Sequence, residues 1–90
     1  MVQVVWTRRA LSDLAAVRAY IGQFSPLAAQ RMAMRLKRAG DSLGAHPDRM
    51  RSVGPGLREL TAIPPYILRY QITSEAVVIL RIRHGAQQHD

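Results

Sequence analysis

The feature that most constrains this fold is the three-residue link 23–25 between two helical patterns. Apolar residues recur at steps of three and four in 8–22, and again in a second segment that begins at Ser25 and can end at Gly44. The two stripes are Leu11, Leu14, Val17 and Ile21, and Met32, Leu36, Ala39 and Leu43. Thr7 can cap the first helix, and Ser25 the second, with Pro26 at its first helical position. A link this short predicts an antiparallel helix hairpin.

Strand-like segments lie on either side of this hairpin. In 2–6 one face carries Val2, Val4 and Trp6 and the other is mostly apolar, which predicts a short strand, and three further strand patterns occupy 57–62, 66–72 and 76–83. The segment 45–56 contains prolines and glycines without periodicity, which predicts a surface loop. The order predicts an α+β fold, β-α-α-β-β-β, in one domain spanning 1–90. The antiparallel helix hairpin packs on one face of a small antiparallel sheet, and the first strand joins an edge of the final three-stranded meander.

Composition narrows the classes of protein to which the chain can belong. The absence of cysteine excludes disulfides and thiolate metal sites. The chain has neither a signal-peptide pattern nor an apolar run of about 18–20 residues, so we expect no membrane association and a cytoplasmic protein. The histidines, His46, His84 and His89, have no metal-ligand spacing, and we expect neither a metal nor a cofactor.

The charge is strongly positive and is carried almost entirely by arginine. The net charge is +7, and twelve of the thirteen basic residues are arginine. The planar guanidinium suits bidentate contact with carboxylates or phosphates. We therefore expect a partner that is an acidic protein segment, a nucleic acid, or both in turn. Composition does not choose between them.

Strand alternation predicts where part of this charge lies. The set Tyr66, Leu68, Tyr70 and Ile72 and the set Val78, Leu80, Ile82 and His84 are assigned to the helix side of the sheet. Arg69, Gln71, Arg81 and Arg83 then share the side that no helix covers, together with Glu59 or Arg58, depending on register. This cationic shelf predicts a surface on which a partner segment lies. The alternative is a solvated face on which arginines pair with Glu59 or Glu75.

Several motifs in the last third of the chain occur together in one known family. The run "GPGLRELTAIPPYILRYQITSEAVVILRIRHGAQ" spans 54–87. It resembles the RelE/ParE superfamily of toxins from bacterial type II toxin–antitoxin systems. It is most similar to the ParE-type branch, whose members often read PG-x-REL, then PY, then ILR-hydrophobic-x-HGAQ. The upstream runs "TRRALSDLAAVRAYI" and "AAQRM" also agree, so the resemblance covers nearly the whole chain and implies the same β-α-α-β-β-β fold.

This superfamily contains two activities. RelE-type members are ribosome-dependent mRNA endoribonucleases, a reaction that needs a base, a proton donor and cations for the developing charge. The residues that could fill those roles are Arg58, Glu59, Arg83 and His84, with Glu59 as the base. Nuclease members commonly carry arginine where this chain has Ile67, and the nearest arginine is displaced to Arg69. No tyrosine or basic tail follows His84.

ParE-type members resemble this chain better, and that resemblance implies inhibition of DNA gyrase without chemistry by the toxin itself. We therefore expect a non-enzymatic toxin with no catalytic residues. It should be neutralised by a small cognate antitoxin with a ribbon-helix-helix N-terminus and an acidic-amphipathic C-terminal segment, and should reach operator DNA only through that antitoxin. The predicted antitoxin-binding residues are Arg69, Gln71, Arg81 and Arg83. The predicted target-binding residues are Arg49, Arg51, Arg83 and His84.

Two other interpretations stay open at this point. One is a RelE-like mRNA interferase, which is an enzyme. The other is a degenerate member of the superfamily that still binds its antitoxin and has lost its toxicity.

Overall fold

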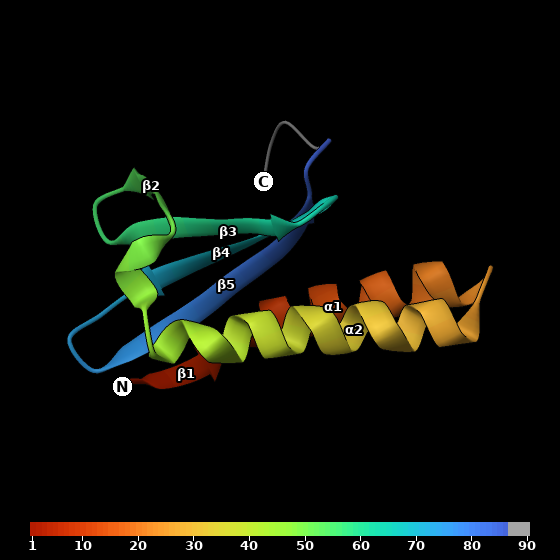
Figure 1. The fold of residues 1–90 in the computed structure, drawn as a ribbon, viewed down its shortest axis with the longest axis horizontal. Coiled ribbons are helices and arrows are strands. Elements are labelled where there is room, and N and C mark those ends of the chain that lie inside the picture. Colours follow the sequence, from red (N-terminus) through yellow and green to blue (C-terminus); the bar gives the residue numbers. More distant parts are fainter. Residues whose placement is uncertain (87–90) are drawn as a thin grey trace.

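A helix hairpin and a five-stranded sheet make up the fold (Figure 1). The computed structural model describes residues 1–86. The elements are β1 (Gln3–Trp6), α1 (Arg8–Gly22), α2 (Pro26–Asp41), β2 (Arg51–Gly54), β3 (Leu57–Ile63), β4 (Tyr66–Ile72) and β5 (Ala76–His84), with short 3-10 turns at Ser42–Gly44 and Pro47–Arg49. The strand order is β1-β5-β4-β3-β2. This is the predicted α+β architecture, with one strand more than expected.

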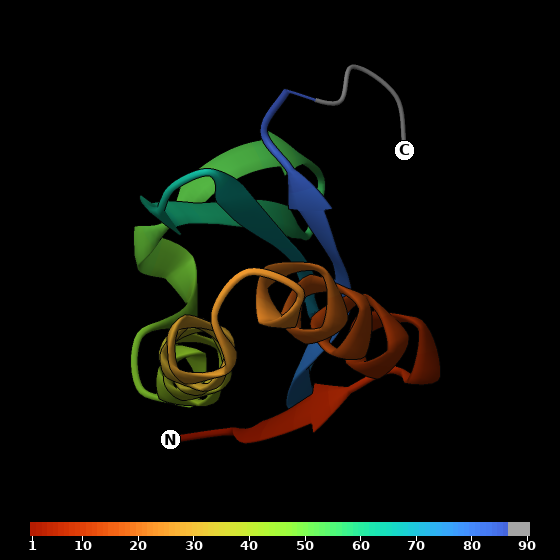
Figure 2. The same ribbon diagram turned by 90° about the vertical axis from the view of Figure 1, so that its right-hand side faces the viewer.

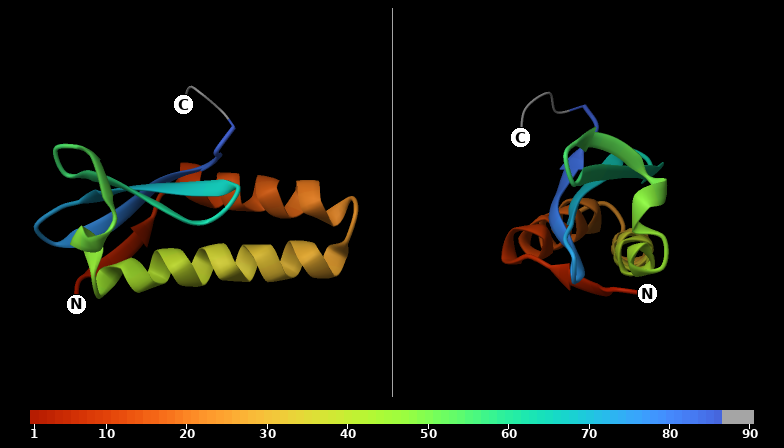
Figure 3. Two further views of the ribbon diagram at one scale, coloured as in Figure 1. Left: turned by 45° about the horizontal axis from the view of Figure 1, so that its top comes forward. Right: turned by 90° about the vertical axis from the view of Figure 1, so that its left-hand side faces the viewer.

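The predicted helix hairpin is confirmed, and so are its two caps. Thr7 Oγ1 accepts a hydrogen bond from the backbone N–H of Ala10 at 3.0 Å, and Ser25 Oγ accepts one from that of Ala28 at 3.1 Å. Viewed along the hairpin, the twisted sheet curves around the helices (Figure 2). The linked end of the hairpin extends past the ends of the strands (Figures 1 and 3). Much of each helix near that end therefore has no strand against it.

Two predictions about the sheet are wrong. The segment 45–56 is not wholly a loop, because 51–54 forms the edge strand β2, which pairs antiparallel with β3. The sheet is also mixed and not antiparallel throughout. β1 joins an edge of the meander as predicted, and that edge is β5, but β1 runs parallel to β5. β2 is difficult to predict because it is followed directly by the Gly54-Pro55-Gly56 turn. Gly56 takes a left-handed φ of 69° in that turn. Breaker residues in a tight hairpin turn look like a loop when read alone.

The core lies between the helices and the inner face of the sheet. Tyr66, Leu68 and Tyr70 of β4 are buried, which confirms the predicted inner face of that strand. One cluster of buried side chains contains Leu36, Leu60, Ile63, Tyr66, Leu68 and Ile82, and a second contains Ala10, Leu43, Tyr70, Val77 and Ile79. No helix within residues 1–86 is long and apolar enough to cross a membrane.

The predicted inner face of β5 is partly wrong because the strand contains a bulge. Arg69 pairs with Arg81, but the next residue, Tyr70, pairs with Ile79, which leaves Leu80 as an extra residue. Val77 and Ile79 are therefore fully buried on the helix side, where alternation had placed Val78 and Leu80. Thr7 Oγ1 donates to the carbonyls of Ile79 and Leu80 at 2.9 and 3.2 Å, so the start of α1 satisfies the backbone at the bulge.

Candidate partner-binding face

A buried carboxylate lies at the centre of the outer face of the sheet. Glu59 pairs in register with Arg51 of β2 on one side and Arg69 of β4 on the other. Its oxygens accept hydrogen bonds from Arg51 at 2.6 Å, Arg69 at 2.9 Å and Arg83 at 3.0 Å. Register thus resolves the choice that the sequence left open, because Glu59 and not Arg58 lies on this face. We call the four residues Arg51, Glu59, Arg69 and Arg83 the Glu59 cluster.

The arginines keep the Glu59 carboxylate ionised at neutral pH. Burial raises the pKa of its carboxyl, but the hydrogen bonds from Arg51, Arg83 and Arg69 outweigh burial and lower that pKa from 4.5 to about 2. The Glu59 side chain is 1% exposed, whereas the Arg51 side chain is 63% exposed. With three guanidinium groups around one carboxylate, the cluster keeps an excess positive charge that faces outward through Arg51 and, in part, Arg69.

Arg81, which was predicted to share this face, binds a helix instead. Its Nε donates to Asp13 Oδ2 of α1 at 2.9 Å, and the same oxygen accepts from the backbone N–H of Ile82 at 2.9 Å. Because β1 pairs with β5 only as far as Ile79, the later part of β5 is a sheet edge. Asp13 accepts the hydrogen bond from the backbone N–H of Ile82 that a neighbouring strand would otherwise accept at this edge. Asp13 was not identified from the sequence, although it is the sole acidic residue in 1–40.

The predicted cationic shelf is therefore smaller than expected, and its arginines form ion pairs with carboxylates of this chain. Arg69, Arg83 and the exposed Gln71 lie on the outer face, and Arg51 joins them from β2, in the segment for which the sequence predicts a loop. Strand alternation in the sequence does indicate Glu59 as a candidate for this face. What the sequence did not predict is that a single carboxylate contacts three arginines.

The four candidate nuclease residues lie on different faces of the sheet. Glu59 and Arg83 belong to the Glu59 cluster on the outer face. Arg58 pairs with the core residue Tyr70, and its Nη1 donates to the carbonyl of Met50 at 2.6 Å. His84 pairs opposite Tyr66, the two rings meeting edge to face at 5.8 Å. Glu59 thus contacts Arg83, and Arg83 and His84 line one pocket at the end of β5, whereas Arg58 belongs to neither group.

The predicted target-binding residues also lie in different parts of the structure. Arg51 and Arg83 both contact Glu59, whereas Arg49 lies exposed in the turn Pro47–Arg49 and His84 at the end of β5. Within residues 1–86 no group of three or more histidine, aspartate or glutamate side chains could hold a metal ion. His89 and Gln87, the last residue of the recognised motif, lie outside the described residues.

Comparison with known proteins places this fold in one class. A family model described as the ParE toxin of the parDE type II toxin–antitoxin system matches residues 4–89. A solved structure described as a chromosomal ParDE system from P. aeruginosa superposes with a TM-score of 0.80 at 26% identity, over 93% of this chain and 96% of that one. The helix hairpin on its sheet is therefore the fold of a type II toxin of the RelE/ParE superfamily.

The relatives place the chain within that class. It is 61% identical to "Toxin RelE2" of Caulobacter vibrioides, over 97% of this chain and 99% of that protein. It is 38% identical to "Toxin RelE1" of the same organism, over 89% of each. The chain belongs to the ParE toxin family of type II toxin–antitoxin systems. A toxin of this kind has a cognate antitoxin.

Proposed function

We propose that this toxin inhibits DNA gyrase without chemistry of its own and that its antitoxin lies on the outer sheet face. The observation that carries the proposal is that Glu59, the candidate base, is buried among three arginines and does not line the pocket that Arg83 and His84 share. Glu59 and Arg83 lie on the outer face, while Arg58 and His84 accompany the core residues Tyr70 and Tyr66. A base and a proton donor that act on one phosphodiester must both reach it.

The environment of Glu59 also argues against its use as a base. A carboxylate whose pKa is about 2 is a poor proton acceptor at neutral pH. Its oxygens are occupied by guanidinium groups of Arg51, Arg69 and Arg83. The cluster is built to hold positive charge in place, which suits recognition of an acidic partner better than proton transfer.

The antitoxin is the partner that fits this face. An acidic-amphipathic segment can place its carboxylates against the partly exposed Arg69 and Arg83, which are 28% and 14% exposed, and hydrogen-bond Gln71. Arg81, 24% exposed and held by Asp13, can contact the same segment from the edge of β5. A ribbon-helix-helix N-terminus on that antitoxin would bind operator DNA, and the toxin would reach the operator only through it.

A second candidate function is ribosome-dependent mRNA cleavage. It is favoured by the relatives named RelE and by the arginines around Glu59, which could bind a phosphodiester. In that case Arg83 and Glu59 would act with Arg58 and His84 only after a rearrangement that brings the four together. A toxin that binds its antitoxin and affects neither target would be a degenerate member.

One experiment separates these functions. Purified toxin is added in parallel to gyrase with supercoiled DNA and to ribosomes translating a defined mRNA. The proposal predicts trapped gyrase–DNA cleavage complexes that disappear when antitoxin is added, and intact mRNA. Codon-phased mRNA cuts without a gyrase effect would establish the second function, and inactivity in both assays would indicate the degenerate member.

A further inference from the structure

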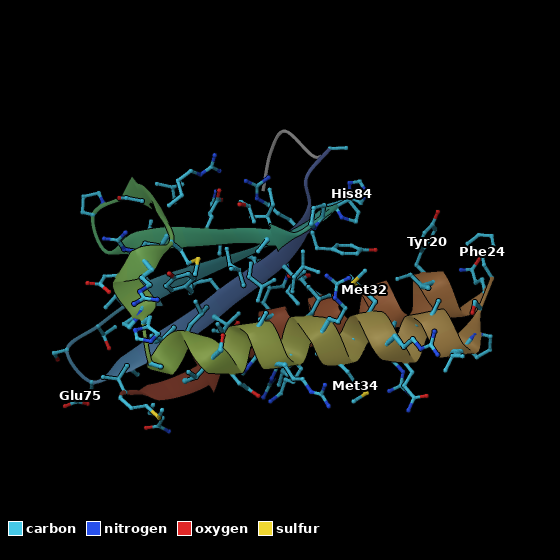
Figure 4. All side chains as sticks on the ribbon, viewed as in Figure 1. Tyr20, Phe24, Met32, Met34, Glu75 and His84 are labelled. Atoms are coloured by element: carbon cyan, nitrogen blue, oxygen red, sulfur yellow. The ribbon has the colours of Figure 1, made fainter. Side chains whose placement is uncertain are left out.

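The linked end of the helix hairpin presents large apolar side chains to solvent. Tyr20 is 60% exposed, Phe24 75% and Leu27 55%. Figure 4 shows Tyr20 and Phe24 together at this end, beyond the sheet. Met34, 43% exposed, lies two turns further along α2. We call Tyr20, Phe24 and Leu27 the hairpin tip.

Backbone hydrogen bonds and one edge-to-face ring contact order the hairpin tip. The backbone N–H groups of Phe24 and Ser25 both donate to the carbonyl of Ile21, at 3.0 and 2.9 Å, and Ser25 caps α2. The rings of Tyr20 and Phe24 meet edge to face with centroids 5.6 Å apart. Aromatic side chains on a hydrogen-bonded turn lose little conformational entropy on binding. Tyrosine and arginine, both present at or beside the tip, are among the residue types enriched in binding hot spots.

Unbalanced positive charge surrounds the hairpin tip. The stretch 14–40 contains five basic residues, Arg18, Arg31, Arg35, Lys37 and Arg38, and no aspartate or glutamate. All five are exposed, and within residues 1–86 Lys37 alone among them forms an ion pair, with Asp41 at the far end of α2. Four arginines of the sheet, Arg51, Arg69, Arg81 and Arg83, pair in contrast with Glu59 or Asp13. A partner that complements this surface needs an apolar pocket with an acidic rim.

We propose that the toxin docks on DNA gyrase through the hairpin tip, with Arg31 and Arg35 contacting carboxylates around the pocket that receives Phe24 and Leu27. The inference rests on the proposed function, because it names the surface that the gyrase inhibitor uses. Leu27 and Met34 are aliphatic, and the two rings contact each other edge to face and do not present parallel stacking planes. These features favour a protein surface over a nucleic acid. A second copy of the toxin is disfavoured because both copies carry the same excess charge.

The test compares two pairs of matched variants in gyrase binding and cleavage-complex formation. In the first pair Phe24→Ser/Leu27→Ser removes the apolar tip, and Val5→Thr/Val53→Thr changes the exposed valines of β1 and β2. In the second pair Arg31→Gln/Arg35→Gln removes charge beside the tip, and Arg8→Gln/Arg38→Gln removes the same charge at the other end of the helices. Unchanged circular dichroism and melting temperature establish that each variant is folded.

The tip variants are expected to need about tenfold more toxin, or more, for half-maximal cleavage complexes, while the matched controls stay within about twofold. All four variants should bind the antitoxin as the wild type does. Full gyrase poisoning by the tip variants would overturn the docking inference while leaving the proposed function intact. An equal loss of antitoxin affinity, or of affinity for a single-stranded oligonucleotide, would assign the tip to that partner instead. A wild-type toxin that does not bind gyrase would overturn the proposed function and the docking inference together.

Discussion

Asp13 of α1 closes the exposed edge of β5 by accepting a hydrogen bond from the backbone N–H of Ile82 at 2.9 Å. The same carboxylate oxygen pairs with Arg81, so one side chain joins the helix hairpin to the strand that carries the family motif. The side chain of Asp13 is 15% exposed and that of Arg81 24%. Removing one partner of a partly buried pair costs more than breaking a surface ion pair, because the other partner is left unsatisfied.

Replacing Asp13 should therefore destabilise the fold. We expect Asp13→Ala to lower the free energy of unfolding by about 2 kcal/mol, because Arg81 and the N–H of Ile82 both lose their acceptor. Asp13→Asn should cost less, since the amide oxygen still accepts from Ile82. Urea denaturation of the two variants and of Ser12→Ala, an exposed neighbour, measures the difference. Equal stability of Asp13→Ala and the wild type would contradict a role for Asp13 at this edge.

Acid should weaken the fold through Glu59. Its folded pKa of about 2 lies below the ordinary value of 4.5, so its contribution is fully present above pH 4.5 and is lost as the pH falls towards 2. A difference of that size corresponds to at most about 3 kcal/mol. Urea denaturation between pH 7 and pH 2 should show this loss in the wild type and a smaller slope in Glu59→Gln. Parallel pH profiles for the two proteins would show that Glu59 does not titrate as described.

Gly40 should tolerate no side chain. A Cβ at this position would clash with the Trp6 ring, whose Nε1 donates to Asp41 at 2.9 Å and whose face lies 5.6 Å from the Lys37 ammonium group. Gly40→Ala gains helix propensity of about 1 kcal/mol, but the overpacking should exceed this gain and lower the melting temperature. Gly22→Ala is the control, because the nearest atom to its Cβ is 3.8 Å away. A stabilised Gly40→Ala would mean that Trp6 moves without cost.

If the antitoxin binds the outer face, its affinity should depend on salt concentration through the arginines of that face. We expect Arg69→Gln/Arg83→Gln to weaken antitoxin affinity by about tenfold at low salt and to flatten its dependence on ionic strength, because these cations meet the acidic segment. Arg8→Gln/Arg38→Gln removes the same charge elsewhere and should leave the dependence nearly unchanged. If both variants alter the slope equally, the antitoxin responds to net charge and not to this face.

The sequence predicted the structural features that neighbouring residues determine. It did not predict those that depend on residues far apart in the chain. Thr7, Ser25 and Pro26 determine helix starts within a few residues, and the hairpin followed from them. The bulge at Leu80 has no local signature, because a strand of apolar residues gives the same pattern with or without an extra residue. The Arg81–Asp13 pair joins residues 68 positions apart, so no spacing rule could find it.

The same distinction applies to the candidate site. Alternation correctly placed Arg69 and Gln71 on the outer face, since β4 is regular. Arg51 was missed as a member of that face because its strand is short and lies beside a Gly-Pro-Gly turn. That Glu59 is buried among arginines depends on the pairing of β2, β3, β4 and β5, which becomes visible only when the sheet is assembled.

The most direct test of the proposed function is the gyrase cleavage assay with purified wild-type toxin, run with and without its antitoxin. The account predicts linear DNA after denaturation of trapped gyrase complexes, in proportion to toxin added, and its loss at equimolar antitoxin. The same preparation should leave ribosome-bound mRNA intact. Codon-phased mRNA cleavage with no linear DNA would contradict the account.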